Sequence, residues 1–339
     1  FCKSMTNNKK MKSIKCLVNI VFTFIIIFAF TSCNSYDFGQ EQYKNEVSLL
    51  SNSAFVYDRQ VAKISEKGDT IYIVAGVSGT NFSTKPFNVG LIKEDSLFHA
   101  YNKSNFDIDV TRFAKILPEE CFSLLETKMQ IKTGEFQAKF PVHLKNLDKL
   151  SPDTIYFLDY ELDPENTPDH NPRKNKVLLR IYKNTEYATT KTNTFYNYTT
   201  SYVTTMEEGG IVRRPTNANQ VFPLGENSVR MLAGDEEMGD YNTALGRINA
   251  RSIKVTVGDQ VPYNPAAKSV VIEPYGTIDV VQMPPTGMYD NTYTIKIIST
   301  PDGRNTYYKE FKLHYKYRTN PTSVYKEVKA VLRMEYNPR

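Results

Sequence analysis

The sequence predicts an all-β protein made of two immunoglobulin-like antiparallel β-sandwich domains in tandem. Short runs rich in β-branched and aromatic residues recur along the chain, and each is bounded by Gly, Pro, Asn or Asp. Several of these runs alternate apolar and polar residues, which is typical of strands with one buried face. Long segments with the apolar spacing of a helix are almost absent. Many short strands with few helices favour sandwiches over layered α/β folds.

The first sandwich is expected over residues 53–186. Its first two strands, residues 54–57 and 70–77, flank turn-forming residues and predict a hairpin-like pair. Only residues 95–101 and 118–125 look helical, and both stretches are short. The remaining runs that we expect to form strands are residues 129–131, 137–144, 154–162 and 176–182.

A stretch rich in Thr and Asn, residues 187–194, marks the expected domain boundary, so the second sandwich is placed at residues 187–339. Ile253, Val255 and Val257 alternate with polar residues and predict one of its strands. The same reasoning predicts further strands at residues 293–297, 311–317 and 324–334.

The chain begins with the features of a signal peptide. Residues 1–32 contain five lysines and no acidic residue, and residues 16–30 form an apolar run. This run is shorter than the roughly 20 residues that a membrane-spanning helix needs, so cleavage before Cys33 fits better than a span. The two small residues before Cys33 resemble a lipobox, whose cysteine receives lipid, including an acyl chain such as palmitate. We therefore expect lipidation of Cys33 and a polar tether over residues 33–52.

Removal of the leader changes the charge of the chain. The five lysines of the leader equal the whole formal charge of +5, so the mature chain is formally neutral. A neutral chain lacks the basic surface that attracts nucleic acid or anionic lipid. Nucleic acid is therefore not an expected partner, and the membrane is expected to be reached through the N-terminal lipid. Of the four cysteines only Cys121 stays unmodified in the mature chain, so no disulfide framework is available.

A Leu-Pro pair and an aromatic residue precede a strand, a Gly turn and an apolar strand in the first half. These residues are Leu117-Pro118, Phe122, Leu124, Met129-Gln130-Ile131, Gly134 and Ile155-Tyr156-Phe157-Leu158. Over roughly residues 40–186 the pattern resembles an uncharacterised N-terminal domain of Bacteroidetes polysaccharide-utilisation lipoproteins. That domain also precedes some family-18 glycoside hydrolases.

The second half contains Phe222-Pro223-Leu224, Asn227-Ser228-Val229-Arg230 and the closing run 311–318. These segments resemble the uncharacterised C-terminal domain that often accompanies the first. The resemblance implies two immunoglobulin-like sandwiches, an outer-membrane lipid anchor and a gene setting of glycan import. Three Asp-Ser/Thr-apolar tripeptides also resemble the sites at which these bacteria O-glycosylate exported proteins, and their acceptors are Thr70, Ser96 and Thr154.

One acidic segment raises the hypothesis of an enzyme. Asp159, Glu161 and Asp163 end an apolar strand and alternate onto one of its faces. They are similar to the acidic strand end of family-18 glycoside hydrolases, which makes a glycoside hydrolase accessory protein a second alternative. The barrel of that family needs about 250 residues of alternating strands and helices, and too few follow. We therefore expect a non-catalytic protein in which this strand face is solvated.

No other constellation in the sequence points to a cofactor or a metal. The four histidines are widely spaced, and no zinc-protease, nucleophile-elbow or phosphate-loop motif occurs. Cys121 is expected to pack as a small apolar residue, and His314 is expected at the surface. The acidic residues 235–237 lack the spaced acids and the glycine of a calcium loop, which favours a solvated turn.

Tyrosines in the second half offer an argument for glycan binding. Sugars present apolar C–H faces edged by hydroxyl groups, so their sites combine an exposed aromatic ring with polar side chains. Several tyrosines stand beside Asn, Asp or Thr, although the absence of Trp removes the most effective stacking platform. The candidates are Tyr196, Tyr198, Tyr202, Tyr241 and Tyr289.

The sequence thus predicts a lipoprotein, anchored in the outer membrane through Cys33 and facing the cell surface, that binds polysaccharide without cleaving it. The second domain lies farther from the anchor and is expected to present the binding surface. The alternative is a structural or assembly partner of an outer-membrane glycan transporter.

Overall fold

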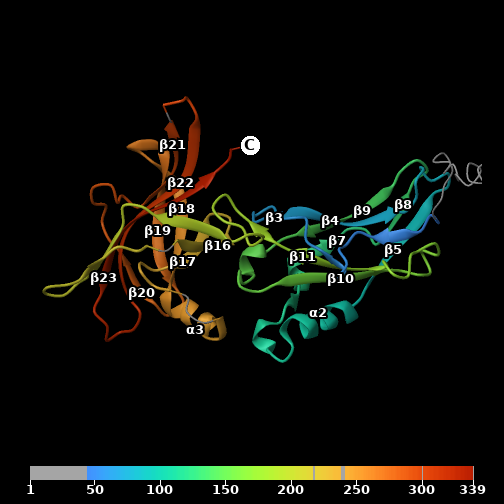
Figure 1. Cartoon of the computed structure of the whole chain (residues 1–339), viewed down its shortest axis with the longest axis horizontal. Coiled ribbons are helices and arrows are strands. Elements are labelled where there is room, and N and C mark those ends of the chain that lie inside the picture. Colours follow the sequence, from blue (N-terminus) through green and yellow to red (C-terminus); the bar gives the residue numbers. More distant parts are fainter. Residues whose placement is uncertain (1–43, 217, 238–240, 300, 339) are drawn as a thin grey trace, which may run out of the picture.

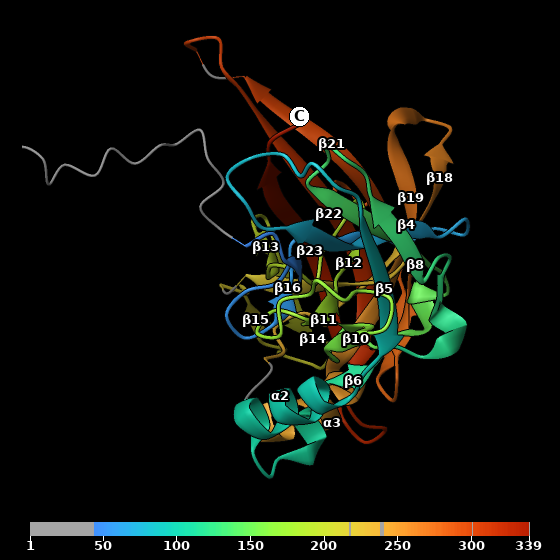
Figure 2. The same cartoon turned by 90° about the vertical axis from the view of Figure 1, so that its right-hand side faces the viewer.

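A computed structural model describes residues 44–216, 218–237, 241–299 and 301–338, without the side chains of residues 241–245. Two β-rich halves lie end to end along its long axis (Figure 1). A view turned by 90° shows the helices α2 (Ser96–Phe106) and α3 (Tyr241–Arg251) on the same side of the molecule (Figure 2). The prediction of an all-β protein with two domains is confirmed.

The first domain contains two sheets. One has the order β1 (Val47–Leu49), β4 (Asp69–Val77), β9 (Gln137–Leu144) and β7 (Phe122–Leu124). The other has the order β2 (Val56–Tyr57), β11 (Lys176–Ile181), β10 (Tyr156–Leu162), β5 (Phe87–Lys93) and β8 (Lys128–Ile131), with β6 (Lys115–Ile116) beside β10. A short pair and three 3-10 turns complete it: β3 (Ala62–Lys63), β12 (Lys183–Asn184), η1 (Val110–Arg112), η2 (Glu119–Cys121) and η3 (Leu147–Lys149). Three pairs are parallel, β2 with β11, β6 with β10 and β3 with β12, which the antiparallel prediction did not include.

Alternating apolar residues hold the two sheets together. On β9 every second residue from Ala138 to Leu144 is at most 5% exposed. Leu158, Tyr160 and Leu162 of β10 belong to the same buried cluster. Burial of one such side chain stabilises the fold by about 1.5–3 kcal/mol. The strands predicted along β9 and β10 are confirmed.

The opposite face of β10 is covered by α2 instead of solvent. Phe157 is 0% exposed, and the ring of Tyr101 from α2 meets it edge-on with centroids 4.7 Å apart. Asp159, the next residue on that face, is 4% exposed. The prediction of a solvated face is therefore wrong at Asp159, because α2 packs over this part of the sheet.

The two predicted helical stretches have different outcomes. Residues 95–101 are confirmed as helical from Ser96 onward, and α2 continues to Phe106. Residues 118–125 instead form the turn η2 and the strand β7. Pairing of β7 with β9 overrides the local preference of this segment. The helix α3 was not predicted.

The second domain is one large sheet. Its neighbour order is β15-β14-β23-β13-β16-β17-β18-β19-β21-β22-β20, and β22 also pairs with β23. That additional pairing closes the strands from β23 through β13 to β22 into a ring. The strands are β13 (Thr194–Tyr198), β14 (Tyr202–Thr205), β15 (Val212–Arg213), β16 (Asn219–Gly225), β17 (Ser228–Leu232), β18 (Ser252–Val261), β19 (Asn264–Tyr275), β20 (Asp279–Gln282), β21 (Thr292–Ser299), β22 (Asn305–Arg318) and β23 (Lys326–Tyr336).

The immunoglobulin-like sandwich predicted for this half is not confirmed, because its strands form a closed, barrel-like sheet. β22 and β23 pair continuously from Tyr307 opposite Tyr336 to Tyr317 opposite Lys326. Long paired strands twist and curve, which brings the two edges of a sheet together. Inward and outward residues alternate in a closed sheet as they do in a sandwich, so the sequence pattern does not separate the two.

The alternation predicted in the second half holds for most strands. Ile253, Val255 and Val257 are at most 3% exposed on β18. Ile295 and Ile297 depart from the prediction, with 44% and 55% of their surface exposed on β21. They lie in a hairpin of β21 and β22 that projects from the rest of the domain (Figure 1). This projection leaves their side chains without a core to pack against.

The chain joins the first domain earlier than predicted. Val47 and Leu49 are 0% and 2% exposed, and their strand β1 pairs with β4. The tether predicted over residues 33–52 is therefore wrong from residue 47 onward. Residues 1–43, which include the predicted signal peptide and Cys33, lie outside the described residues.

The two domains have separate cores that buried polar contacts link. One cluster of buried apolar residues ends at Ile181, and the other begins at Tyr187. Between the domains, Arg230 of β17 forms two hydrogen bonds to the carboxylate of Asp153, at 2.5 and 2.7 Å. The exact boundary between residues 186 and 187 stays a prediction.

Candidate ligand-binding site

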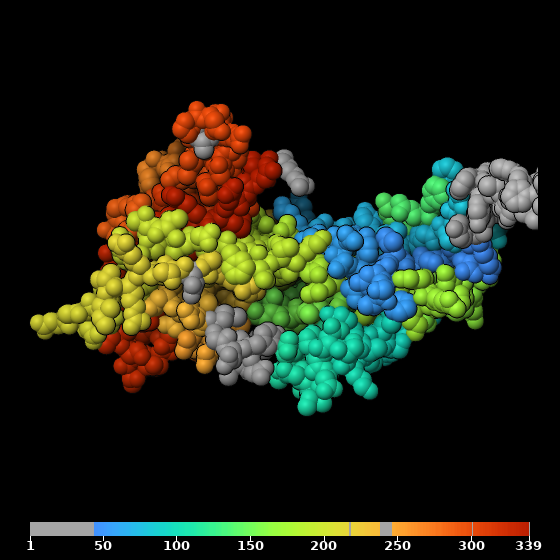
Figure 3. Space-filling view, viewed as in Figure 1, coloured from blue at the N-terminus to red at the C-terminus, as the bar shows by residue number. Residues whose placement is uncertain are grey.

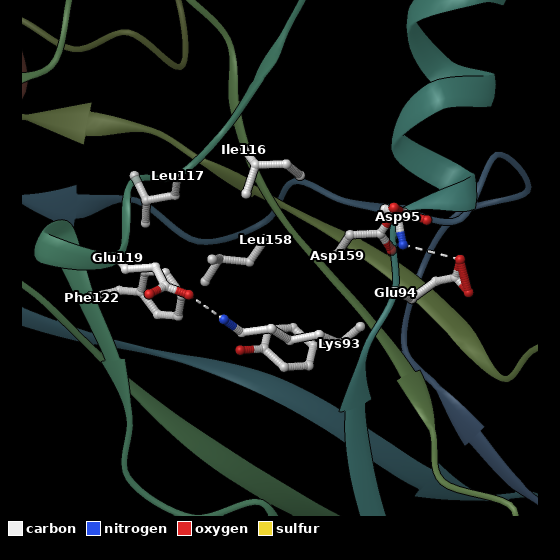
Figure 4. A pocket seen from close by; sticks show the side chains of 10 residues that line it. Lys93, Glu94, Asp95, Ile116, Leu117, Glu119, Phe122, Leu158 and Asp159 are labelled. Carbon is white, nitrogen blue, oxygen red and sulfur yellow. Dashed lines mark hydrogen bonds and ion pairs between the residues drawn. The ribbon is translucent and has the colours of Figure 1, made fainter.

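A pocket of 470 Å³ opens on the first domain where β5, β6, β7 and β10 meet the start of α2. In Figure 4 apolar side chains gather on one side of it, and carboxylates gather beside the first turn of α2. Its volume lies in the range of about 300–1,000 Å³ that is typical of small-ligand sites. The lining residues of this Asp159 pocket are Lys93, Glu94, Asp95, Ile116, Leu117, Glu119, Phe122, Leu158, Asp159 and Tyr160.

Two carboxylates from outside α2 cap the N-terminus of this helix. Asp95 occupies the capping position but makes no side-chain capping hydrogen bond. Instead, Asp159 Oδ2 accepts a hydrogen bond from the N–H of Phe98 at 3.0 Å. Glu94 Oε1 accepts from the N–H groups of Asp95 and Ser96 at 3.0 and 2.6 Å. Because N–H groups of a first helical turn lack helical partners and carry partial positive charge, they hold both carboxylates at the pocket wall.

Asp159 is buried and only partly satisfied. Within the described residues its Oδ1 has no hydrogen-bond partner. Burial disfavours the charged form and raises the pKa of Asp159 to about 6, although the N–H of Phe98 opposes the rise. The negative charge of Glu94 adds to it. A carboxyl group with this pKa offers a ligand an acceptor when ionised and a donor when protonated.

The pKa of Glu94 is shifted in the opposite direction to that of Asp159. Its Oε2 accepts a hydrogen bond from Lys176 Nζ at 2.8 Å. This bond, with the bonds from Ser96, lowers the pKa of Glu94 to about 2. Lys176 also lies 3.5 Å from a carboxylate oxygen of Glu161, so one ammonium group serves two acids. Glu94 therefore stays ionised over the physiological range and is fixed in position.

The mouth of the pocket combines an ion pair with apolar side chains. Lys93 Nζ donates to Glu119 Oε1 at 2.5 Å, and this bond raises the pKa of Lys93 and lowers that of Glu119. Both partners are well exposed, so water screens the pair and its groups are available to a ligand. Of the apolar lining residues, Ile116 is 42% exposed and Phe122 is half-buried. Figure 4 shows Leu158 between Phe122 and Asp159.

The raised pKa of Asp159 predicts a pH-dependent stability. Because the folded state binds its proton more tightly than the unfolded state, the stability contributed by this group is present below pH 4 and is lost as pH rises towards 6. Relative to Asp159→Asn, the wild type is expected to lose on the order of 3 kcal/mol of unfolding free energy over that window. Urea unfolding of both proteins at each pH measures the difference in unfolding free energy. Glu94 is present in both proteins, so its own pH-dependent contribution cancels in the comparison. Parallel curves would contradict the assignment.

The tyrosines predicted to bind glycans do not form one site. Tyr196 is 0% exposed, and its hydroxyl donates to the carbonyl of Tyr187 at 2.9 Å. Its predicted role as an exposed platform is therefore wrong, because alternate residues of β13 point into the closed sheet. Tyr198 is half-buried; its hydroxyl donates to the carbonyl of Gly234 at 2.6 Å and accepts from Asn219 Nδ2 at 2.8 Å.

Tyr202 and Tyr289 lie near each other on the second domain. The hydroxyl of Tyr289 donates at 3.2 Å to the carbonyl of Thr200, which lies two residues before Tyr202 in the chain. The guanidinium of Arg214 lies 5.2 Å from the centre of the Tyr202 ring. Both rings are half-buried, and the side chain of Tyr241 lies outside the described residues. Glycan binding by Tyr202, Tyr289 or Tyr241 stays a prediction.

Family comparisons agree with the two-domain resemblance. A family model for a C-terminal domain matches residues 175–333, and a companion model for an N-terminal domain matches residues 42–169. The chain belongs to the Bacteroidetes family that combines these two domains. No curated protein matches the chain in sequence.

Solved structures of Bacteroides proteins share this fold. A protein of unknown function from Bacteroides ovatus is 15% identical over 87% of this chain and 93% of its own, with a TM-score of 0.60. A multidomain protein including DUF1735 from the same species is 12% identical over 87% and 95%, with a TM-score of 0.59. An auxiliary nutrient binding protein from Bacteroides thetaiotaomicron is 15% identical over 84% and 94%, with a TM-score of 0.58. At these identities the likeness concerns the fold alone.

The predicted modification sites occupy different settings. Thr70 is half-buried on β4, where it pairs with His143 of β9. Ser96 is exposed at the start of α2, and its hydroxyl accepts from Lys176 Nζ at 3.0 Å. Thr154 is half-buried before β10. O-glycosylation at these residues stays a prediction, and Cys33, the predicted lipidation site, lies outside the described residues.

Other residues considered in the sequence have structural roles. Cys121 is 1% exposed and packs in the first core, as predicted. The prediction of a surface position for His314 is wrong: it is 5% exposed, and its ring nitrogens lie 2.6 Å from the carbonyl of Pro284 and 2.7 Å from Glu327 Oε1. Burial follows because the segment between β20 and β21 packs against this residue: besides the contact with Pro284, the N–H of His314 donates to Asn291 Oδ1 at 2.7 Å.

The acidic turn of the second domain is an ion-pair cluster, so the prediction that it is solvated is wrong. Tyr317 and Lys326 donate to Asp235 at 2.9 Å each and to Glu236 at 3.1 Å each. Although burial opposes the change, these bonds hold the pKa of Asp235 below its ordinary value. In the described part of the chain no group of His, Cys, Asp and Glu is arranged to hold a metal ion. None of the described helices has the length and apolar character that crossing a membrane requires.

Sequence reasoning singled out Asp159 but not the residues that complete its pocket. Lys93 lies on β5, whereas Ile116 and Glu119 lie on the successive elements β6 and η2, and no spacing rule connects these two segments. One signal was present: the acidic residues Glu94 and Asp95 before a helical stretch mark a helix N-terminus. It did not reveal that a strand far away in the sequence would cap that helix.

Proposed function

We propose that the chain is a lipid-anchored protein of the outer membrane that faces the cell surface and binds a polysaccharide without cleaving it. The observation that carries this proposal is the Asp159 pocket, where apolar and charged side chains share one mouth. Ile116 and Phe122 fit the apolar C–H face of a sugar ring. The ammonium of Lys93 and the carboxylate of Glu119 fit its hydroxyl groups.

The family and the fold support a binding role. Family membership supports the same setting of glycan import that the sequence resemblance implies. The structure from Bacteroides thetaiotaomicron with a TM-score of 0.58 is named an auxiliary nutrient binding protein. None of the three similar structures described above is named as an enzyme.

Two carboxyl groups with divergent pKa values also favour a second candidate, a glycoside hydrolase. Such enzymes pair an acid of raised pKa with an ionised carboxylate, as Asp159 near 6 and Glu94 near 2 would provide. Both groups, however, are committed to capping α2, and Glu94 is also held by Lys176. Use of either in a reaction would withdraw a cap from the helix. We therefore favour binding without hydrolysis.

Ile116→Ser is expected to weaken polysaccharide binding at least about fivefold, because it removes an apolar contact on the order of 1 kcal/mol. Ile295→Ser is the matched control: Ile295 is 44% exposed on β21, against 42% for Ile116, and lies outside the pocket. Retardation of each protein in native gels containing a panel of polysaccharides measures the effect. Release of reducing sugar is assayed in parallel and is expected to be absent.

Three results would contradict the proposal in different ways. Sugar release that Asp159→Asn abolishes would establish the hydrolase. Binding that survives Ile116→Ser but is lost in Tyr202→Ala or Tyr289→Ala would move the site to the second domain. If no polysaccharide binds at all, the role of partner to an outer-membrane glycan transporter is favoured, and cross-linking to such a transporter would test it.

A further inference from the structure

An exposed aromatic pair lies at the end of the first domain that is remote from the second domain. Phe82 and Phe136 are 59% and 44% exposed, and their rings stack with centroids 4.3 Å apart and planes 29° apart. The rings come from two loops, residues 78–86 between β4 and β5 and residues 132–136 between β8 and β9. These loops lie at the right-hand end of the molecule (Figure 1; space-filling view in Figure 3).

The two loops are tied together, so the pair is held in place before any partner binds. The N–H of Gly134 donates to the carbonyl of Ser83 at 3.2 Å, which links one loop to the other. The N–H of Val77 donates to the carbonyl of Phe136 at 2.9 Å. Ser83 is 4% exposed and anchors its loop through a hydrogen bond to the carbonyl of Lys85 at 2.7 Å. Preorganisation of this kind lowers the entropy lost on binding.

The chain enters the domain at the same end. Ser78 lies four residues before Phe82, and its hydroxyl donates to the carbonyl of Lys44 at 2.8 Å. Ten residues, 34–43, separate Lys44 from Cys33. Ten residues span at most about 35 Å, even when fully extended. A lipid on Cys33 therefore keeps this end of the domain close to the bilayer surface.

The charges at this end are balanced. Lys85 pairs with Asp169 at 2.8 Å, and Lys44 pairs with Glu46 at 2.8 Å. Electrostatic attraction to anionic lipid is therefore not what this surface offers. Exposed aromatic rings instead favour the boundary between headgroups and acyl chains.

We propose that Phe82 and Phe136 enter the membrane interface and form a second contact that orients the first domain on the lipid surface. The proposal rests on the lipid anchor at Cys33 of the proposed function. The anchor holds this end of the domain at the membrane, and a second weak contact gains strength from the high local concentration that the anchor creates. The contact directs the second domain away from the bilayer.

Tryptophan fluorescence tests this contact, because the chain contains no Trp. Phe82→Trp places one at the aromatic pair. Phe195→Trp is the control, since Phe195 is 44% exposed, against 59% for Phe82, but lies on β13 of the second domain. The mature chain is coupled through the thiol of Cys33 to a maleimide phospholipid in phosphatidylcholine and phosphatidylethanolamine vesicles with brominated acyl chains. Cys121 does not compete, because it is 1% exposed and burial raises the pKa of its thiol.

Brominated lipid is expected to quench the emission of Phe82→Trp by about half or more and to leave that of Phe195→Trp unchanged. Equal quenching of the two, or none in Phe82→Trp, would overturn the proposal. Matching urea unfolding of both variants shows that both are folded. The anchor itself is tested separately: labelled palmitate should enter the wild type in cells and not Cys33→Ala. Failure of that labelling would remove the proposed anchor without altering the quenching result.

Discussion

Arg230→Met is expected to lower the free energy of unfolding of the whole chain by about 3 kcal/mol or more, because it leaves a largely buried carboxylate without its partner. Arg230 is 1% exposed and makes both of its short bonds to Asp153 across the domain interface. Its guanidinium also lies 4.3 Å from the ring centre of Phe222 and 5.3 Å from that of Tyr275. The substitution removes the charge pair and the stacking together. Urea unfolding of the full chain measures the loss.

A pair in the same sheet provides the control for this prediction. Lys254 faces Arg230 in the register of β17 and β18, and its ammonium lies 3.1 Å from Glu273 with both side chains well exposed. Lys254→Met is expected to change stability by less than about 1 kcal/mol. A double-mutant cycle with Asp153→Asn isolates the coupling across the interface. A loss for Arg230→Met no greater than that for Lys254→Met would show that the contact does not hold the domains together.

Strands were predictable where apolar alternation coincides with burial. β9 matches its predicted range of 137–144, and Ile253 to Val257 on β18 face the core as expected. The closure of the second sheet was not predictable, because it depends on which distant strands pair. The continuous pairing of β22 with β23 leaves no trace in the local pattern of either strand.

The Thr- and Asn-rich stretch before the second domain shows a different limit. Its composition predicts a domain boundary, yet its polar side chains bond to the backbone around them. Thr190 Oγ1 accepts from the N–H of Lys183 at 2.9 Å, and Thr194 Oγ1 accepts from the N–H of Thr189 at 3.1 Å. Short hydroxyl side chains favour both linkers and tight turns, so composition alone does not decide between them.

The Asp159 pocket was only partly predictable for a related reason. The acidic residues on β10 were visible as an alternating set, and solvent was the simplest environment for them. The structure instead places α2 over that face, where an N–H group of the first helical turn, without a helical partner, donates to the carboxylate of Asp159. Local sequence identifies the charged group. Its burial and its raised pKa follow from packing against α2, whose Phe98 is 61 residues away from Asp159 in the chain.

Tyr196→Ala is expected to destabilise the second domain by about 3–5 kcal/mol, as the loss of a large core ring does. The ring is 0% exposed and lies 5.4 Å from that of Phe311, measured between centroids. Tyr196→Phe keeps the ring and loses only the bond to the carbonyl of Tyr187, so a loss of about 1 kcal/mol is expected. Urea unfolding of the full chain measures both losses.

The control for Tyr196 is an exposed tyrosine of the same domain. Tyr263 is 67% exposed between β18 and β19, and Tyr263→Ala is expected to change stability by no more than about 0.5 kcal/mol. The expected order of losses is Tyr196→Ala above Tyr196→Phe above Tyr263→Ala, because burial of the ring and its hydrogen bond both stabilise Tyr196. If Tyr196→Ala unfolded like the wild type while losing retardation by a polysaccharide, the ring would have to face solvent. The aromatic platform expected from the sequence would then be restored, and the packing of β13 into the closed sheet would be wrong.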